Sequence, residues 1–527
     1  MEDKIIRGIE DATHRGRKEM FRIGVAMLFL VTVMLYASGI RAEGAPISLE
    51  LVIAAMIGGY MAMNIGANDV ANNVGPAVGS RALTLTGAIL IAAIFEASGA
   101  LIAGGDVVGT IKKGIIDPSL IQNGDEFIWL MMAALLAGAL WLNMATYLGA
   151  PVSTTHSIVG GVLGAGIAAG GWGIANWPTM GTIAASWVIS PVIGGTVAAL
   201  FLYWIKHSIT YKKDMLAAAN RMVPLLVAIM AWAFSAYLIL KGLKKLIKVD
   251  IITAIGIGFL IAVVIYLIMR PMVKKFGLNK ENGKPTVNAM FTVPLIFAAA
   301  LLSFAHGAND VANAVGPLAA ISDAVGSGNV SSKVAIPLWV MLVGGVGIAL
   351  GLALYGPKLI RTVGTEITEL DQMRAFCIAM AAALTVIVAS QLGLPVSSTH
   401  IAVGGVFGVG FLREYKKSIY ARVIHEIERH HAGQDQEEVA QFMKDFESAP
   451  LEEKRLMLAQ LKKNKAVAEL SNKERKQLRK VYRQELVKRS ALFKIAAAWI
   501  ITVPMSAFLA AMLFFTIRGM MIPKFVP

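Results

Sequence analysis

The chain has 527 residues, of which 56% are hydrophobic and only 16% are charged. A soluble protein of this length needs more charged surface, so the composition excludes an ordinary soluble fold. The net charge of +15 does not indicate nucleic-acid binding, because Lys and Arg gather between apolar segments, as in the cytoplasmic loops of membrane proteins. With a single cysteine, Cys377, no intramolecular disulfide can form.

Long stretches without Asp, Glu, Lys or Arg recur along the chain, among them 23–40, 128–156, 157–205 and 375–410. A helix needs about 20 apolar residues to cross the hydrocarbon core of a bilayer. We therefore predict an all-α polytopic membrane protein with about 11–13 apolar segments, several of them interrupted by Gly and Pro.

The character of the sequence changes several times along the chain. The first 22 residues mix both charges and lead into an apolar run, which indicates an uncleaved anchor rather than a signal peptide. After residue 412, 32 of the next 78 residues are charged, 19 of them basic, with helical spacing. We divide the chain into a basic segment with an extra transmembrane helix (1–46), a first transport repeat (47–205), a linker with two apolar helices and basic loops (206–287), a second transport repeat (288–412), a charged helical insert (413–490), and a final transmembrane helix with a tail (491–527).

Two motifs occur twice, in the same order and at nearly the same spacing. Residues 66–79 read GANDVANNVGPAVG and residues 307–320 read GANDVANAVGPLAA, identical at ten of fourteen positions. Residues 151–166 read PVSTTHSIVGGVLGAG and residues 395–410 read PVSSTHIAVGGVFGVG, identical at eleven of sixteen. Transporters are often built from repeats in inverted orientation, with the substrate at the repeat interface near the membrane midplane. We expect that architecture, with broken helices and re-entrant hairpins.

The GANDVAN motif puts a carboxylate inside apolar sequence, where it is costly unless it serves a function. Its glycine, Gly66 or Gly307, can break a helix, which exposes carbonyl oxygens and two half-helix ends. With the Asn and Asp oxygens these suit Na⁺ better than a thiophilic metal. The alternative, that Asn and Asp only cap a helix, is compatible with ion binding. The predicted Na⁺ ligands are Asn68, Asp69, Asn309 and Asp310.

The second motif supplies three hydroxyls in a row after a proline. Hydroxyls beside the free N–H groups of a helix N-terminus form an anion site. A re-entrant hairpin fits, because the stretches 138–150 and 157–171 are each short for a full crossing. The alternative is a kinked helix whose Ser and Thr bond back to its carbonyls. The duplication and the trailing glycines favour an anion site made by Ser153, Thr154, Thr155, Ser397, Ser398 and Thr399.

Neither motif contains Arg or Lys, so the anion would be held by hydroxyls, amides, helix ends and cotransported cations. Cations that neutralise Asp69 and Asp310 would make the pocket acceptable to an anion only once they are bound. This dependence is a physical route by which anion and cation binding, and hence symport, could be coupled.

Glu96, His156 and His400 are further candidates, for proton transfer or gating. Glu96 stands in an uncharged run, and the two histidines close the hydroxyl motifs. A histidine can change protonation near neutral pH. The alternatives are a helix–helix contact for Glu96 and structural hydrogen bonds for the neutral histidines. His306 precedes the second GANDVAN, but Ile65 holds that place in the first, which excludes a symmetric role.

Both motif pairs resemble the inorganic phosphate transporter (PiT) family, as do KGIIDP, SSKVAIPLWVMLVGGVGIALGL and ALTVIVASQLGLPVSSTH. The resemblance implies import of inorganic phosphate coupled to Na⁺ or H⁺, inverted repeats and a homodimer, and GANDVAN in both halves is similar to the sodium-coupled branch. It places Na⁺ at the four residues given above, and phosphate among the six hydroxyls together with Asn72 and Asn313. The chain departs from the family in its extra N-terminal segment, in its insert, and at Ala379, where some members carry a Glu.

Other functions fit less well. A sulfate or other tetrahedral-oxyanion transporter would share the architecture, although protonated phosphate can donate a hydrogen bond that sulfate cannot. An ion channel or membrane receptor has no need of a duplicated site with both anion and cation ligands. We expect no enzyme, because the sequence holds no Walker motif and no evident nucleophile–base pair. We expect no cofactor beyond Na⁺ as the coupling ion, and no nucleic-acid partner. The expected location is a prokaryotic plasma membrane, with the N-terminus and the 413–490 insert cytoplasmic.

Overall fold

A computed structural model describes residues 2–40, 47–121, 123–242, 249–327, 336–365, 370–430 and 489–521. These residues are mostly helical, and the only β pairing among them is one isolated bridge between Ile116 and Ala175. Besides the α-helices there are two short π-helices, η1 and η4, and two 3₁₀ turns, η2 and η3. In chain order the elements are α1 (Glu2–Ser38), α2 (Leu49–Asn68), α3 (Val70–Gly79), α4 (Leu85–Ala103), α5 (Gly105–Gly109), η1 (Thr110–Gly114), η2 (Pro118–Leu120), α6 (Gly124–Leu148), α7 (Thr154–Gly170), η3 (Trp172–Ile174), α8 (Trp177–Ile205), η4 (Lys206–Thr210), α9 (Met215–Gly242), α10 (Ile251–Gly277), α11 (Lys284–Met290), α12 (Thr292–Asp310), α13 (Ala312–Ser327), α14 (Leu338–Tyr355), α15 (Pro357–Thr365), α16 (Gln372–Gln391), α17 (Ser398–His430) and α21 (Arg489–Met521).

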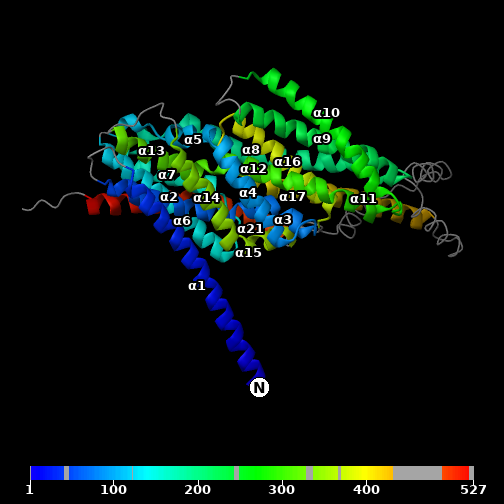
Figure 1. Cartoon of the computed structure of the whole chain (residues 1–527), viewed down its shortest axis with the longest axis horizontal. Coiled ribbons are helices and arrows are strands. Elements are labelled where there is room, and N and C mark those ends of the chain that lie inside the picture. The colour runs from blue at the N-terminus through cyan, green and yellow to red at the C-terminus, as the bar shows by residue number, and fades with distance from the viewer. Residues whose placement is uncertain are drawn as a thin grey trace, which may run out of the picture.

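Within these described residues, 11 helical stretches are long and apolar enough to cross a membrane. This confirms the predicted all-α polytopic membrane fold. α16 lies mostly inside the bundle, whereas α10 packs chiefly on α9 at the edge of the molecule and exposes apolar side chains such as Ile252 and Leu260 (Figure 1). Such an apolar outer surface suits a lipid environment.

Helices of the two repeats are interleaved. α2 of the first repeat packs on α14 of the second, and α12 of the second packs on α4 of the first. A Cβ at Gly66 would lie 1.9 Å from the carbonyl oxygen of Ile348, and one at Gly307 would lie 2.2 Å from that of Glu96. Only glycine permits such close backbone contact. The two motif glycines therefore join the repeats at equivalent places.

A second exchange involves the helices that carry the hydroxyl motifs. α7 packs on α21, the final transmembrane helix, and α17 packs on α8 of the first repeat, so the helix that follows each hydroxyl motif packs on a helix from a distant part of the chain. A Cβ at Gly164 would lie 2.1 Å from the carbonyl oxygen of Ala507, and one at Gly408 would lie 2.0 Å from that of Gly195. The glycines that trail each motif thus serve helix packing.

The helix interruption at each GANDVAN motif is one residue long. α2 ends at Asn68 and α3 begins at Val70, while α12 ends at Asp310 and α13 begins at Ala312. Gly66 lies inside α2, and Gly307 lies inside α12 in the same way. The expectation that these glycines break the helix is therefore wrong. Each glycine instead lets the backbone of the other repeat approach closely, because it has no side chain.

The hairpins that carry the hydroxyl motifs turn through glycines. Gly149 follows α6 with φ of 74°, and Gly393 follows α16 with φ of 67°, a left-handed conformation that favours glycine. Extended segments then lead into α7 and α17. The stretch 138–150, expected to be short, is the end of the 25-residue helix α6.

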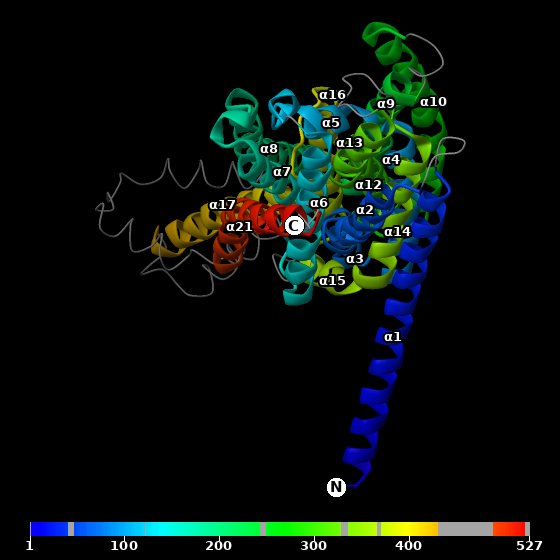
Figure 2. The same cartoon turned by 90° about the vertical axis from the view of Figure 1, so that its left-hand side faces the viewer.

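Three of the predicted segment boundaries, after residues 287, 412 and 490, fall within the described helices α11, α17 and α21. α1 joins the basic N-terminal segment and the apolar run into one helix that extends far beyond the bundle (Figures 1 and 2). α17 runs on past residue 412 and projects beside α21 (Figure 2). Most of the predicted insert, residues 431–488, lies outside the described residues.

Candidate functional site

Asn68 fixes the turn of the first hairpin. Its amide nitrogen donates to Thr146 Oγ1 at 2.9 Å and to the carbonyl oxygen of Ala150 at 3.2 Å. Its side-chain oxygen accepts from the backbone N–H of Val152 at 3.1 Å. Because both the nitrogen and the oxygen of this buried amide form hydrogen bonds to the hairpin, Asn68 positions the backbone that leads into the hydroxyl motif.

Asn309 does the same in the second hairpin. It donates to Ser390 Oγ at 2.8 Å and to the carbonyl oxygen of Leu394 at 3.4 Å. Ser390 and Leu394 lie 244 residues after the two partners of Asn68, the same offset that relates the hydroxyl motifs. The first Asn of each GANDVAN copy is therefore bound to the hairpin of its own repeat.

Asp69 connects the hydroxyl motifs of both repeats. Its Oδ2 accepts from Thr154 Oγ1 at 2.6 Å and from the backbone N–H of Thr154 at 3.3 Å. Its Oδ1 accepts from Thr399 Oγ1 at 3.0 Å. All three residues are buried. One carboxylate thus lies between the N-termini of α7 and α17.

Asp310 has a related but different set of partners. Its Oδ2 accepts from Ser398 Oγ at 3.0 Å and lies 2.9 Å from His306 Nε2. Its Oδ1 is buried and has no hydrogen-bond partner among the described residues. Ser398 occupies in the second repeat the place of Thr154 in the first. The hydrogen bond between an Asp carboxylate and a hydroxyl is therefore present in both repeats. At Asp310, Oδ1 remains able to accept a hydrogen bond or to bind a cation.

Asn72 and Asn313 reach across the repeats. Asn72 Nδ2 donates to Thr399 Oγ1 at 2.9 Å, and Asn313 Nδ2 donates to Thr154 Oγ1 at 3.0 Å and to Thr155 Oγ1 at 3.2 Å. The structure therefore brings these amides and hydroxyls into one cluster around the carboxylates.

Two of the predicted substrate hydroxyls, those of Ser153 and Ser397, also accept hydrogen bonds from the backbone. Ser153 Oγ accepts from the backbone N–H of His156 at 3.1 Å, and Ser397 Oγ accepts from that of His400 at 3.2 Å. Each serine is thus an N-cap, which satisfies one of the free N–H groups of its helix. Each serine immediately precedes its helix and stabilises the first turn of that helix.

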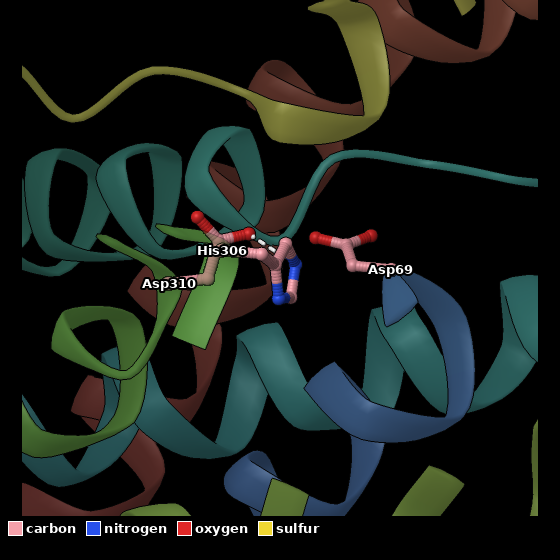
Figure 3. Close-up of side chains that lie close together, drawn as sticks. All are labelled: Asp69, His306 and Asp310. Atoms are coloured by element: carbon pink, nitrogen blue, oxygen red, sulfur yellow. Dashed lines mark ion pairs between the residues drawn. The ribbon is translucent and has the colours of Figure 1, made fainter. Parts of the chain in front are cut away.

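His306 is the residue that the sequence reasoning missed. Its Nδ1 lies 2.7 Å from Glu96 Oε2, and Glu96 Oε1 accepts from Asn73 Nδ2 at 2.8 Å. Figure 3 shows its imidazole between the carboxylates of Asp69 and Asp310. One ligand atom from each of these three residues lies within 4.8 Å of the others.

Its place in the second repeat has no polar counterpart in the first. Ile65 aligns with His306 in the motif, and Ile348 makes the glycine contact that Glu96 makes on the other side. A polar pair therefore replaces an apolar pair in one half only. The sequence does contain a signal, since His306 stands four residues before Asp310 and Glu96 is the one acidic residue in an apolar stretch. That His306 pairs with Glu96, however, is visible only in the three-dimensional structure.

The site carries an excess of acidic groups. Asp69, Glu96 and Asp310 are buried around one imidazole, and in the described part of the chain no Lys or Arg pairs with them. Buried charge inside a membrane protein needs compensation. The cluster therefore favours the binding of cations or protons.

The two other predicted histidines, His156 and His400, contact each other and two tryptophans rather than these carboxylates. The His156 ring lies 3.8 Å from that of Trp187, the His400 ring 3.5 Å from that of Trp499, and the two imidazoles 4.3 Å from each other, all between centroids. Their ring nitrogens have no hydrogen-bond partner among the described residues. This arrangement packs α7 and α17 against α8 and α21.

Comparison with known proteins identifies the family. The family model described as phosphate transporter family matches residues 65–510. The chain belongs to this family. A provisionally named phosphate permease of Helicobacter pylori strain J99 is 54% identical over 524 residues, covering 98% of this chain and 98% of the relative. Phosphate transporters are integral membrane proteins and not enzymes, so both predictions are confirmed.

More distant members share the core of the chain. A provisionally named phosphate permease of Pyrococcus horikoshii is 40% identical over 390 residues, covering 72% of this chain and 93% of its own. A solved structure described as the sodium-dependent phosphate transporter is 32% identical, with a TM-score of 0.73, and covers 90% of this chain and 100% of its own. The phosphate transporter fold is thus shared across these relatives.

Proposed function

We propose that this phosphate transporter is a secondary symporter that imports inorganic phosphate together with Na⁺, both bound at the repeat interface near the membrane midplane. The observation that carries the proposal is the bonding of Asp69 to Thr154 and Thr399, one hydroxyl from each repeat. The carboxylate suited to a cation and the hydroxyls suited to an anion are thereby one hydrogen-bonded unit. The similarity to a sodium-dependent transporter supports the choice of ion.

Coupling follows from how these hydroxyls are used. In the structure the Thr154 and Thr399 hydroxyls donate to Asp69, and while they do so they cannot donate to an anion. A cation bound to the carboxylate takes over the role of these donors and reduces the local negative charge. The hydroxyls can then rotate and donate to phosphate, which therefore binds well only after the cation.

Phosphate would be held without any Lys or Arg. The N-termini of α7 and α17 supply backbone N–H groups and the positive ends of two helix dipoles. Hydroxyls of Thr154, Thr155, Ser398 and Thr399 and the amides of Asn72 and Asn313 add donors, while Ser153 and Ser397 fix the helix ends.

Cations would bind chiefly to Asp69 and Asp310. Carboxylate oxygens are the ligands that hard cations prefer. Because Asn68 and Asn309 are bound to their hairpins, we assign them to positioning the Asp that follows each of them. Glu96 and His306 add a protonatable pair, which makes H⁺ coupling the second candidate.

The free acceptors at the site favour phosphate over sulfate. Asp310 Oδ1 and Asn72 Oδ1 are buried without hydrogen-bond partners among the described residues. Monohydrogen phosphate can donate to such an acceptor, whereas sulfate has no proton to donate. A site that hydrogen-bonds a substrate OH rejects an analogue lacking it, because its polar groups stay unpaired.

For the cellular setting we propose the plasma membrane of a prokaryote, a homodimer, and a cytoplasmic N-terminus and insert. The organisms of the relatives support the location, and basic residues in the N-terminal segment and in 413–490 support the orientation. With one crossing by α21, the C-terminus would then face outside.

The test is uptake of labelled phosphate into proteoliposomes under a sodium gradient, a proton gradient or neither, with excess unlabelled sulfate as competitor. We expect sodium-driven uptake that sulfate does not reduce. Uptake driven only by protons would show that H⁺ is the coupling ion and would favour Glu96 and His306 as the proton-binding residues. Entry of labelled sulfate in place of phosphate would overturn the substrate.

A further inference from the structure

Contacts between the two repeats occur in reciprocal pairs. Asn72 of the first repeat donates to Thr399 of the second, and Asn313 of the second repeat donates to Thr155 of the first. The partners in these two contacts are equivalent residues of the duplicated motifs. Reciprocal contacts of this kind indicate an approximate two-fold relation between two similar halves. We therefore expect each further contact between the repeats to have a counterpart in which the repeats exchange roles.

Helices α8 and α21 are related in the same way. The contacts of the glycines that trail the hydroxyl motifs pair Gly195 of α8 with Ala507 of α21, 312 positions later. Trp187 and Trp499 are separated by the same 312 positions. Both are half-buried, and their rings lie 3.8 and 3.5 Å, between centroids, from the imidazoles that close the two hydroxyl motifs. Trp187 and Trp499 are therefore equivalent residues.

The two tryptophans differ in their hydrogen bonds. Trp187 Nε1 donates at 3.2 Å to the carbonyl oxygen of Pro395, which begins the second hydroxyl motif. The equivalent acceptor for Trp499 is the carbonyl oxygen of Pro151, but the buried Trp499 Nε1 has no hydrogen-bond partner among the described residues. A buried N–H group without a partner is unfavourable. The protein therefore leaves one of two equivalent donors unpaired.

Two threonines break the symmetry in the same direction. Thr155 Oγ1 donates to the carbonyl oxygen of Val396 at 3.1 Å, whereas the equivalent Thr399 Oγ1 donates to Asp69 Oδ1 at 3.0 Å. The acceptor equivalent to Asp69 Oδ1 is Asp310 Oδ1, which has no hydrogen-bond partner in the described part of the chain. Thr155 is thus bonded to the second hydroxyl motif instead of the second aspartate.

The first hydroxyl motif is held by its own repeat. The backbone N–H of Val152 donates to Asn68 at 3.1 Å, and no corresponding bond joins Val396 to Asn309 within the described ranges. Residues of the first repeat therefore hold both motifs, the asparagine for the first and the tryptophan and threonine for the second.

We propose that Trp187 and Trp499 are positioning residues that hold the two hydroxyl motifs in turn while the transporter changes the side to which its phosphate site is open. In the state described here, Trp187 is bonded to Pro395. In the alternate state, Trp499 donates to the Pro151 carbonyl and the Trp187 indole is released. The inference rests on the proposed carrier with inverted repeats, in which exchange of the roles of the repeats turns the site to the other side.

This exchange keeps the two states close in free energy. Each state has one bonded and one unpaired indole, so the bond lost at Trp187 is replaced by an equivalent bond at Trp499. A carrier requires such a balance, because a strongly favoured state would leave the other one almost unpopulated. Thr155 and Thr399 exchange acceptors in the same step, so the aspartate with an unpaired oxygen is Asp310 in one state and Asp69 in the other.

The first test follows the indole N–H groups by NMR in the full-length wild-type protein labelled with ¹⁵N-tryptophan. The chain has nine tryptophans, and the two signals of interest are those missing from Trp187→Phe and Trp499→Phe. Exchange is measured from microseconds to seconds, the range of such transitions. We expect both signals to exchange at one rate, one toward the hydrogen-bonded shift as the other moves away from it. Exchange in the same sense, at unrelated rates or at neither signal would overturn the proposal.

The phenylalanine variants should shift the equilibrium in opposite directions. Trp187→Phe removes a bond of the described state and Trp499→Phe one of the alternate state, so each should change the ratio of states about threefold to tenfold. In Trp187→Phe the Trp499 signal should move to the hydrogen-bonded shift. Trp232→Phe is the matched control, because Trp232 also donates to a backbone carbonyl, that of Ile255 at 2.9 Å. It should leave both signals unchanged, and an unmoved Trp499 signal in Trp187→Phe would contradict the exchange.

Transport in the two directions separates this role from a purely structural one. The apparent KM for phosphate is measured for influx and for efflux in proteoliposomes with the protein in one orientation. Because apparent affinity falls with the population of the competent state, one variant should raise the influx KM and lower the efflux KM, and the other should do the reverse. Equal losses in both directions would show that the tryptophans serve packing alone.

The outcomes also distinguish this inference from the proposed function. Phosphate uptake by the wild-type protein with indoles that do not exchange would overturn the role of the tryptophans and leave the phosphate symporter standing. Absence of phosphate uptake by the wild-type protein would overturn the proposed function itself.

Discussion

Thr399 of the second repeat donates a hydrogen bond of 3.0 Å to Asp69 of the first, although 330 residues separate them in the chain. The same carboxylate accepts from Thr154 in its own repeat at 2.6 Å. The hydroxyl motifs of both repeats therefore donate to one buried carboxylate. This relationship links cation binding to anion binding in the proposed mechanism.

Removal of the Asp69 charge should abolish coupled transport. We expect Asp69→Asn and Asp310→Asn each to lower sodium-driven phosphate uptake by at least about 100-fold, since loss of one partner of a buried ion pair costs roughly 3 kcal/mol or more. Asp250→Asn is the matched control, because that exposed Asp caps α10 and Asn caps equally well. Normal transport by Asp69→Asn with unchanged sodium dependence would contradict the assignment.

Glu96 and His306 should behave as one unit. We expect Glu96→Gln and His306→Gln each to slow uptake about tenfold, since each loses a buried charge-assisted contact, and the double variant to be no slower than the slower single one. Uptake rates under sodium and under proton gradients measure this. Fully additive losses would show that the two residues act independently.

Asn309 should affect stability more than sodium affinity. Asn309→Ala leaves the Ser390 hydroxyl and the Leu394 carbonyl without this donor, which should cost about 1–3 kcal/mol in unfolding free energy. Asn64→Ala is the control, because Asn64 donates to the Tyr60 carbonyl within its own helix. A thermal shift in detergent and the sodium concentration for half-maximal uptake separate the two effects. Loss of sodium affinity without loss of stability would make Asn309 a direct ligand.

The glycines after each hydroxyl motif should be intolerant of a methyl group. Gly408→Ala would put a Cβ 2.0 Å from the carbonyl oxygen of Gly195, and such overpacking costs about 1–3 kcal/mol. Gly256→Ala in α10 meets nothing within 4 Å and should be neutral or stabilising. Equal melting temperatures for the two variants would be inconsistent with the close packing of α8 and α17.

The sequence predicts the fold class well, and its duplicated motifs select residues that the structure brings together, because both depend on local patterns. Apolar stretches of spanning length predict the helices, and the duplicated motifs point to Asp69, Asp310 and the threonines that the structure brings together. A buried carboxylate is costly wherever it lies, so its presence in apolar sequence is informative without any structure.

The remainder depends on packing between distant segments. His306 was set aside because Ile65 holds its place in the first repeat, yet it contacts Glu96, 210 residues away. The packing of α7 on α21 and of α17 on α8 also leaves no local signature, since the glycines that permit it were interpreted as support for the anion site. Reasoning from symmetry thus selected the residues of the candidate site that the two repeats share and missed His306 and Glu96, which have no counterpart in the other repeat.

The most direct test of the central claim is the affinity for phosphate as a function of sodium concentration, measured by equilibrium binding to the purified protein. We predict that saturating Na⁺ strengthens phosphate binding at least about tenfold over choline, and that phosphate strengthens Na⁺ binding by the same factor, as thermodynamic linkage requires. Asp69→Asn should lose this coupling. Phosphate binding of equal strength with and without sodium would contradict the account.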